Sequence, residues 1–165
     1  MTLAQGPPTL RRMEPGDVEA VVAIERASFP KPWGPAQFLK ELQQEWSTLL
    51  LAVIPPAPGQ PGAACQIAGF VHFWVVHDEI HILNLACAPA HRRQGIARQL
   101  LEETEARARR AGSAVLTLEV RRSNVAAQAL YGGLGYERVG VRKKYYSEEG
   151  EDAIVMTRTL KERGF

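Results

Sequence analysis

Hydrophobic and polar residues along this chain are spaced in two different ways, and the first spacing predicts helices. Residues 14–29 and 36–46 each place apolar side chains three or four positions apart, which gives a helix one apolar face. Pro15 and Asp17 precede the first apolar stripe, as is typical of a helix start. The connecting segment 29–35 contains three prolines and is expected to be irregular, because proline cannot donate a backbone hydrogen bond.

The second spacing consists of short apolar runs between turn residues, and it predicts strands. Strands are expected at residues 9–13, 47–54, 66–76, 79–88, 114–120, 136–146 and 151–160. Two further helices are expected at 95–111 and 123–135. Because helix 95–111 connects strand 79–88 with strand 114–120, those two strands should be parallel neighbours. The order of the elements therefore predicts a mixed α/β fold.

The length and composition are those of an ordinary globular chain. Its 165 residues can bury a core and favour a single domain over residues 1–165. The proline- and glycine-rich segment 55–62 is expected to be a loop inside that domain, since strand patterns resume on both sides. No apolar run reaches the roughly 20 residues of a membrane span, and the first residues lack a signal-peptide pattern. We therefore expect a cytoplasmic protein without membrane contact.

Charge and metal-binding residue types narrow the possible functions. A net charge of +2 is too small to favour direct nucleic-acid binding. Cys65 and Cys87 form no CxxC pair, so neither zinc nor redox chemistry is indicated, and Cys87 is interpreted as a small buried hydrophobe. The histidines have no metal-ligand spacing with Asp, Glu or Cys, so no metal is expected. His77 and His81 are interpreted as turn and strand-surface residues.

The stretch HRRQGIARQLLEE, residues 91–103, places a glycine and several arginines at the start of a helix. The first N–H groups of a helix have no partner inside it, and the helix dipole favours an anion there. Gly95 leaves room for close backbone approach, and Arg92, Arg93 and Arg98 add positive charge. A pyrophosphate fits this arrangement, and a plain helix start with solvated arginines fits it equally well. The stretch matches neither the P-loop nor the GxGxxG fingerprint.

Longer motifs around that stretch resemble a known enzyme family. NLACAPAHRRQGIARQLL, residues 84–101, resembles the acyl-CoA signature of the GNAT acetyltransferases, with CAPA in place of the commoner VDP and Ala97 in place of a second glycine. LTLEVRRSNVAAQALYGGLGYERVGVRKKYYSEEGEDAIVM, residues 116–156, resembles the RimI-type ribosomal-protein alanine N-acetyltransferases. The resemblance is strong over residues 79–160 and looser before them, where SFPKPWGPAQF resembles the family's loop between its first helices.

The resemblance implies the GNAT fold, a central mixed seven-stranded sheet with a parallel central strand pair and about four flanking helices. It implies acetyl-CoA as the acyl donor, with its pyrophosphate at the helix entry and no metal. Backbone groups of residues 85–87 would pair with the pantetheine amides, and a backbone N–H there would bind the oxyanion of the tetrahedral intermediate. The residues implied to bind acetyl-CoA are Leu85, Ala86, Cys87, Arg92, Arg93, Gln94, Gly95, Ile96, Ala97, Arg98 and Asn124.

Glu119 is a candidate general base for acetyl transfer to an amine. It lies out of phase with the apolar residues of strand 114–120 and near its end, where partial desolvation would raise the pKa of its carboxyl group. From the residues alone, a structural glutamate paired with Arg121 or Arg122 is the other interpretation. The resemblance implies catalysis, because RimI-type enzymes use the glutamate of LEVR as proton acceptor, directly or through water.

Tyr131 is a candidate proton donor to the departing CoA thiolate, or else a core tyrosine packed beneath the sheet. The resemblance implies the donor role, since this residue occupies the tyrosine of the family's ALY motif. Ser123 or Asn124 is expected to cap helix 123–135, most simply Asn124, and the resemblance adds a contact of Asn124 with acetyl-CoA.

Three aromatic residues bear on the acceptor of the acetyl group. The resemblance implies that hairpin 136–160 closes over a peptide whose backbone bonds to Tyr145 and Tyr146, although both are also ordinary strand aromatics. Trp33 would form the opposite wall or fill the core. The implied acceptor is the N-terminal alanine of a small-subunit ribosomal protein. Its α-amine has a pKa near 8, against about 10.4 for lysine, so a modest base suffices. A small-molecule amine, a lysine side chain and a non-catalytic acyl-CoA-binding module remain the alternatives.

Overall fold

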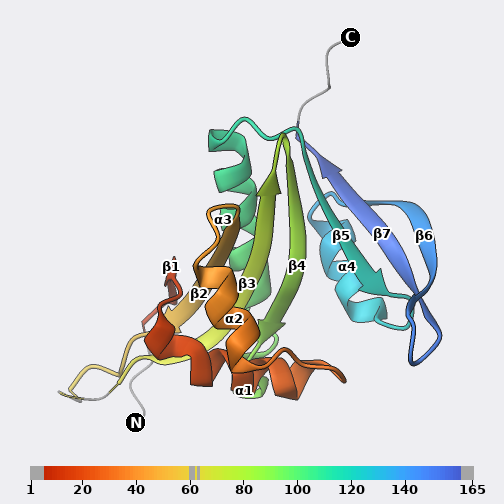
Figure 1. Ribbon diagram of the computed structural model, residues 1–165. Coiled ribbons are helices and arrows are strands. Elements are labelled where there is room, and N and C mark those ends of the chain that lie inside the picture. The colour runs from red at the N-terminus through yellow and green to blue at the C-terminus, as the bar shows by residue number, and fades with distance from the viewer. Residues whose placement is uncertain (1–5, 60–61, 63, 161–165) are drawn as a thin grey trace. The chain divides into compact units, whose positions relative to one another are not determined.

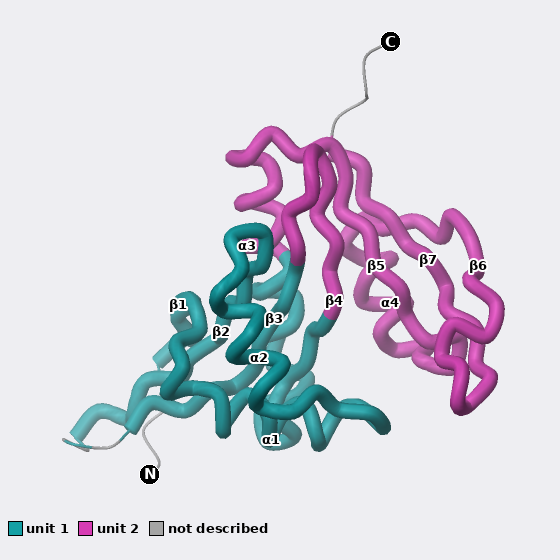
Figure 2. Tube along the Cα trace, viewed as in Figure 1, with its two compact units in different colours: residues 1–73, 84–101 teal, residues 74–83, 102–165 magenta. Residues whose placement is uncertain are grey.

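The computed structural model describes residues 6–59, 62 and 64–160. The chain divides into two compact units: residues 1–73 and 84–101 belong to unit 1, and residues 74–83 and 102–165 to unit 2 (Figure 2). Strand β4 and helix α3 each run from one unit into the other. The expectation of a single domain over residues 1–165 stays a prediction. Of the loop predicted at 55–62, residues 60 and 61 lie outside the described residues.

Seven strands form one mixed sheet in the order β1-β2-β3-β4-β5-β7-β6 (Figure 1). The strands are β1 Thr9–Arg12, β2 Ser47–Ile54, β3 Gln66–Val76, β4 Glu79–Cys87, β5 Val115–Arg121, β6 Glu137–Tyr146 and β7 Glu151–Thr159. Strands β4 and β5 are parallel, with Glu79 opposite Val115 and Ile82 opposite Leu118. The predicted mixed α/β fold with a parallel pair at these two strands is confirmed.

In the part of the chain that the structure describes, four α-helices accompany the sheet, together with short 3₁₀ turns at Pro15–Asp17 and Pro89–His91. The helices are α1 Val18–Ser28, α2 Pro35–Leu42, α3 Ile96–Arg110 and α4 Val125–Gly133. Asn124 caps α4 as predicted, because its side-chain oxygen accepts the N–H of Ala127 at 3.1 Å.

The prediction of one helix over 36–46 is wrong at its carboxyl end. The N–H groups of Gln43 and Gln44 donate to carbonyls only three residues earlier, at 3.2 and 3.1 Å. These tighter bonds close the last turn, so α2 stops at Leu42. Trp46, which continues the apolar spacing, is left 51% exposed in the turn before β2.

The core of unit 1 is formed by α1, α2 and strands β2 and β3, together with Met13, which follows β1, and Ala86 of β4. Strand β2, STLLLAVI, is buried along almost its whole length, as its uninterrupted apolar run predicts. Each large side chain buried in this way contributes roughly 1.5–3 kcal/mol to folding. The buried residues of this cluster are Met13, Val21, Val22, Ile24, Phe38, Leu49, Leu51, Val53, Phe70 and Ala86.

A polar group is also buried in unit 1. The ring of His72 is wholly buried, and its Nε2 lies 2.8 Å from the Ser47 hydroxyl and 3.3 Å from a carboxylate oxygen of Glu41. Burial lowers the pKa of His72 to about 4, against the opposing charge of Glu41. The imidazole is therefore neutral at physiological pH.

Unit 2 is built on β5 and its antiparallel neighbour β7. Alternate residues of β5 are buried, and two of them face buried partners across the ladder: Leu118 is opposite Met156, and Val120 is opposite Ile154. The residue between them, Glu119, therefore emerges on the other face of the sheet. Strand β6 lies at the edge of the sheet and is exposed along nearly its whole length.

Gly69 of β3 permits a close approach of backbone segments in unit 1. A Cβ at this position would lie 2.9 Å from the carbonyl oxygen of Ala86 and 3.1 Å from Cγ2 of Ile96. Ala86 lies near the end of β4 and Ile96 is the first residue of α3, so the two flank the segment that connects these elements. The absent side chain thus fixes how closely that segment packs against β3.

Gly69→Ala should destabilise the protein by about 1–3 kcal/mol, because the added methyl group meets a backbone oxygen that cannot move aside. Gly132→Ala is the matched control: a Cβ there has nothing within 4 Å, and alanine in a helix is favoured over glycine by roughly 0.5–1 kcal/mol. Urea unfolding measures both changes. A Gly69→Ala protein as stable as the wild type would contradict this account of the packing.

Candidate active site

Glu119 of β5 has both of its carboxylate oxygens engaged. His81 Nε2 lies 2.7 Å from Oε2, and Nε of Arg142 lies 3.3 Å from Oε1. All three residues belong to unit 2, and the Glu119 side chain is 9% exposed. Since the carboxylate accepts, the imidazole must carry its proton on Nε2 to donate this hydrogen bond.

These partners lower the pKa of Glu119 below its ordinary value of 4.5. The hydrogen bond from His81 has the largest effect and, with the charges of His81 and Arg142, it outweighs burial, which acts in the opposite direction. The expectation of a raised pKa is therefore wrong, because it considered desolvation without the partners. Pairing of Glu119 with Arg121 or Arg122 is wrong too, since those two arginines form ion pairs elsewhere.

His81 is a site residue that the sequence interpretation missed. It was expected to be a strand-surface histidine, but it is 28% exposed and its ring contacts both Glu119 and Trp74, whose ring centroid is 6.3 Å away. His81 lies opposite Thr117 in the parallel ladder, so it shares a face with Glu119, two residues further along β5. The clue in the sequence is a histidine and a glutamate on two strands predicted to be parallel neighbours.

Two ion pairs in unit 2 connect the start of β7 to the residues that precede α4. Arg121 pairs with Glu151 at 3.1 Å, and Arg122 pairs with Asp152 at 3.1 Å. Glu151 also accepts the backbone N–H of Ser123 at 2.9 Å. The hairpin is thus fastened to the residues that precede the α4 cap.

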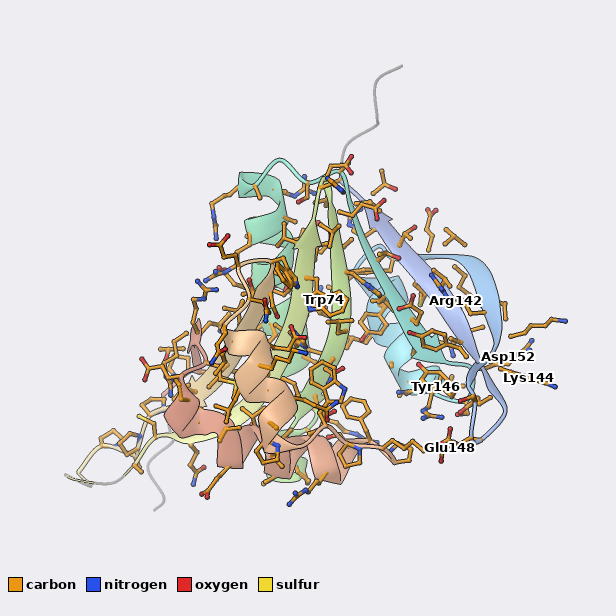
Figure 3. The ribbon with its side chains drawn as sticks, viewed as in Figure 1. Trp74, Arg142, Lys144, Tyr146, Glu148 and Asp152 are labelled. Atoms are coloured by element: carbon orange, nitrogen blue, oxygen red, sulfur yellow. The ribbon has the colours of Figure 1, made fainter. Side chains whose placement is uncertain are left out.

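The β6 strand contains an irregularity at the two tyrosines predicted to contact the acceptor. The register with β7 shifts between Arg142 and Tyr146, and Lys144 adopts a left-handed φ of 51°. The ring centroids of Tyr145 and Tyr146 consequently lie 5.2 Å apart. Figure 3 labels Arg142 and Tyr146, which both belong to β6. The guanidinium of Arg121 covers the Tyr146 ring at 3.9 Å, whereas Tyr145 is 47% exposed.

Tyr131 of α4 is nearly buried and its ring packs against Tyr136, with 5.6 Å between centroids. Burial raises the pKa of Tyr131 above its ordinary value of 10. The phenol is therefore protonated at every pH at which the protein would be assayed.

In unit 1, strand β4 ends beside the start of α3. Gly95 has a φ of 81°, and nothing lies within 4 Å of where its Cβ would be. The N–H of Gln99 donates to the Gly95 carbonyl at 3.0 Å, so the N–H groups of residues 96–98 precede the first donor inside the helix. The N–H of Ala97 contacts the Cys87 thiol, whose pKa is raised chiefly by burial. The open glycine and the early N–H groups are the features that an anion requires.

Arg92 has a more specific position than a solvated arginine. Its guanidinium donates to the carbonyls of Cys87 at 3.3 Å and Ala27 at 3.4 Å, and to the Ser28 hydroxyl at 3.3 Å. It thereby joins the end of α1 to the end of β4. Its charge is held at the end of the strand.

Trp33 lies in the loop between α1 and α2 and is half-buried. Its ring packs against Phe38 and His72, with centroids 5.4 and 5.3 Å away. One side of the indole therefore belongs to the core of unit 1, as one of the two interpretations of this residue predicts.

Over residues 6–59, 62 and 64–160, no three His, Cys, Asp or Glu side chains are grouped so as to hold a metal ion. None of the helices in that part of the chain has the length and apolar character that a membrane crossing requires.

Comparison with known proteins decides the family. Residues 18–136 match the acetyltransferase (GNAT) family. The chain belongs to that family. It is thus an acetyl-CoA-dependent N-acetyltransferase, and the GNAT resemblance of its motifs is confirmed.

Full-length relatives of this acetyltransferase confirm the RimI-type resemblance. This chain is 35% identical over 150 residues to the ribosomal protein bS18-alanine N-acetyltransferase of Escherichia coli K12. The alignment covers 90% of this chain and 95% of that one. The chain is 32% identical over 161 residues to the N-alpha-acetyltransferase RimI of Mycobacterium tuberculosis, covering 96% of each. The crystal structure of the Escherichia coli ribosomal-protein-S18-alanine N-acetyltransferase matches with a TM-score of 0.79 and 34% identity, over 95% of this chain and 96% of that one.

Removing the imidazole of His81 should raise the pKa of Glu119, because burial remains while the strongest group that lowers the pKa is lost. We expect His81→Leu to move the titration of the Glu119 carboxyl carbon, followed by ¹³C NMR, to higher pH. His77→Asn is the control, since His77 is exposed in a turn with a φ of 53°, which asparagine tolerates. An unchanged Glu119 titration in His81→Leu would contradict the assigned hydrogen bond.

Proposed function

We propose that this acetyltransferase transfers acetyl from acetyl-CoA to the N-terminal α-amino group of a protein, the N-terminal alanine of a small-subunit ribosomal protein. The observation that carries the proposed chemistry is the Glu119 carboxylate held by His81 and Arg142. The acceptor is supported by relatives named for ribosomal protein bS18 at 35% identity. A ribosomal acceptor agrees with the cytoplasmic location expected from the sequence.

The start of α3 fits the pyrophosphate of acetyl-CoA. Backbone N–H groups precede the first donor inside the helix, the helix dipole favours an anion, and Gly95 leaves its surroundings open. Bound there, acetyl-CoA supplies the thioester carbon that the amine attacks. The residues proposed to contact it are Leu85, Ala86, Cys87, Arg92, Arg93, Gln94, Gly95, Ile96, Ala97, Arg98 and Asn124.

Glu119 is proposed to accept the proton that the amine loses during attack, directly or through one water. A free α-ammonium group has a pKa near 8, so a carboxylate with a lowered pKa does not remove its proton beforehand. The nitrogen becomes far more acidic once its bond to the thioester carbon forms, and the proton then passes to the carboxylate. His81 acts as a positioning residue, because its hydrogen bond fixes the orientation of that carboxylate.

Tyr131 is proposed to stabilise the departing thiolate of CoA. Its buried phenol keeps its proton and donates a hydrogen bond to sulfur. A thiol has a pKa of about 8.5, below that of this phenol. Complete proton transfer from Tyr131 is therefore uphill, and water protonates the thiolate after it leaves.

The acceptor peptide is proposed to lie along the β6–β7 hairpin. Arg121 fixes the Tyr146 ring from one side, and the exposed Tyr145 next to it leaves its hydroxyl free to bond a peptide backbone. In unit 1, Trp33 is proposed to contact the acceptor with the face of its indole that the core of that unit leaves uncovered.

Two peptides test the acceptor assignment. One begins with a free alanine, and the other has the same sequence with a blocked N-terminus and an internal lysine. We expect mass spectrometry to show acetylation of the free-alanine peptide only. Acetylation of the lysine peptide, or of neither peptide by a protein that still binds acetyl-CoA, would contradict the proposal.

Glu119→Gln should reduce turnover of the alanine peptide by roughly 10²- to 10⁴-fold, the usual range for loss of a proton-transfer group. Tyr131→Phe should reduce it by roughly 10²- to 10³-fold, the usual range for loss of one hydrogen-bond donor to a developing negative charge. Tyr136→Phe is the matched control, because Tyr136 is a buried tyrosine in ring contact with Tyr131 but has no proposed part in the reaction. It should retain wild-type turnover within a few fold. Full activity of Glu119→Gln would remove Glu119 from the mechanism.

A further inference from the structure

Glu25 is a buried carboxyl group on the apolar face of α1. The side chains around it on this helix are Val21, Val22 and Ile24, and Glu25 itself is only 2% exposed. The sequence gives little sign of this, since a glutamate in an amphipathic helix is expected on the solvent side. A carboxyl group in such a position needs partners, because burial penalises its charge.

Two segments of unit 1 provide those partners. The side-chain amide of Asn84 in β4 donates to both carboxylate oxygens, at 3.0 and 3.1 Å. The backbone N–H of Trp33 donates to Oε1 at 3.4 Å. Burial raises the pKa of Glu25 to about 7, against the opposing effect of these hydrogen bonds, and no cation is among the groups that shift it.

These contacts connect the loop at Trp33 to strand β4. Asn84 immediately precedes Leu85, the first residue of the backbone segment assigned to the pantetheine of acetyl-CoA. The indole of Trp33 itself packs against the rings of Phe38 and His72. Glu25 is therefore the group through which the loop between α1 and α2 is joined to the strand that faces the acyl donor.

Stability alone does not account for a carboxyl group at this position. Apolar residues in place of Glu25 and Asn84 together would fill this space without a desolvation penalty, and replacing a whole buried polar pair with apolar groups is often neutral or stabilising. What an apolar residue in place of Glu25 could not do is accept the N–H of Trp33 and the amide of Asn84 together.

We propose that Glu25 is a positioning residue that sets the affinity for the acceptor peptide by fastening the loop at Trp33 to Asn84 of β4. The inference rests on the proposed function in one respect, the contact of Trp33 with the acceptor. Its loss should therefore alter recognition of the peptide and leave the acetyl-transfer step itself largely unchanged.

The test compares Glu25→Leu with Glu25→Gln. Glu25→Leu should raise KM for the alanine peptide by about tenfold or more, the effect of losing the hydrogen bonds that place the loop. Its kcat and its KM for acetyl-CoA should stay close to those of the wild type, and its melting temperature should fall by a few degrees, because the donors on Asn84 and Trp33 lose their acceptor. Glu25→Gln keeps an oxygen acceptor of the same shape and should keep KM for the peptide near the wild-type value. Asn84→Ala cuts the same connection from the other end and should also raise KM for the peptide.

A merely structural role predicts a different pattern. The inference is overturned if Glu25→Leu keeps the wild-type KM for the peptide, or if KM for peptide and acetyl-CoA rise together with a lowered melting temperature in both Glu25 variants. If Glu25→Leu does not fold, Asn84→Ala decides: a wild-type KM for the peptide there overturns the inference.

A second readout does not depend on the acceptor. With 5-fluorotryptophan incorporated, the ¹⁹F resonance of Trp33, assigned with Trp33→Phe, should shift in Glu25→Leu and stay in place in Glu25→Gln. If the wild type fails to acetylate the alanine peptide while this shift occurs, the proposed acceptor is wrong and the positioning role of Glu25 stands. If the resonance is the same in wild type and Glu25→Leu, the positioning role is wrong whatever the acceptor.

Discussion

A carboxylate that stays ionised on a nearly buried strand must be compensated by its neighbours, and unit 2 is organised around that requirement at Glu119. The hydrogen bond from His81 and the ion pair with Arg142 use both carboxylate oxygens. They draw together the β4 strand, the β5 strand and the edge strand β6. The ion pairs of Arg121 and Arg122 with the β6–β7 turn leave Arg142 as the arginine that reaches Glu119.

This arrangement determines what kind of base the carboxylate can be. With its pKa lowered, Glu119 is charged throughout the physiological range and does not compete with an ammonium group for its proton. In the proposed mechanism the carboxylate acts later, as the proton acceptor for a nitrogen already bonded to carbon. A carboxyl group with a raised pKa would be a stronger base but would be partly protonated before the amine arrived. The environment of Glu119 favours a permanent charge over basicity.

The sequence predicts the elements of this fold well and their mutual contacts poorly. Strands β2 and β3 have the predicted boundaries, and the Asn124 cap is where local pattern places it, because these features depend on neighbouring residues. The acyl-CoA signature is also a continuous stretch of sequence, so the sequence alone indicates the family. The hydrogen bond between His81 and Glu119 depends on the register of two strands, which no local pattern specifies.

Dependence on segments distant in the chain also explains why the sequence did not reveal the contacts of Arg92 and Glu25. Arg92 looks like a solvated arginine until α1 and β4 are brought beside it. Glu25 looks like a surface residue of an amphipathic helix until Asn84 and Trp33 surround it. Both are polar groups whose role is set by segments distant in the chain, and both join segments that local pattern treats as independent.

The pH dependence of kcat for the alanine peptide, in wild type and Glu119→Gln, shows whether Glu119 is permanently ionised during turnover. The account predicts that wild-type kcat rises with pH to a plateau set by the amine, whose pKa is near 8 or above, and that Glu119→Gln lowers the whole curve without changing its shape. A step in the wild-type curve between pH 6 and 7 that disappears in Glu119→Gln would show a carboxyl group with a raised pKa. That result would contradict the assignment of Glu119 as a permanently ionised proton acceptor.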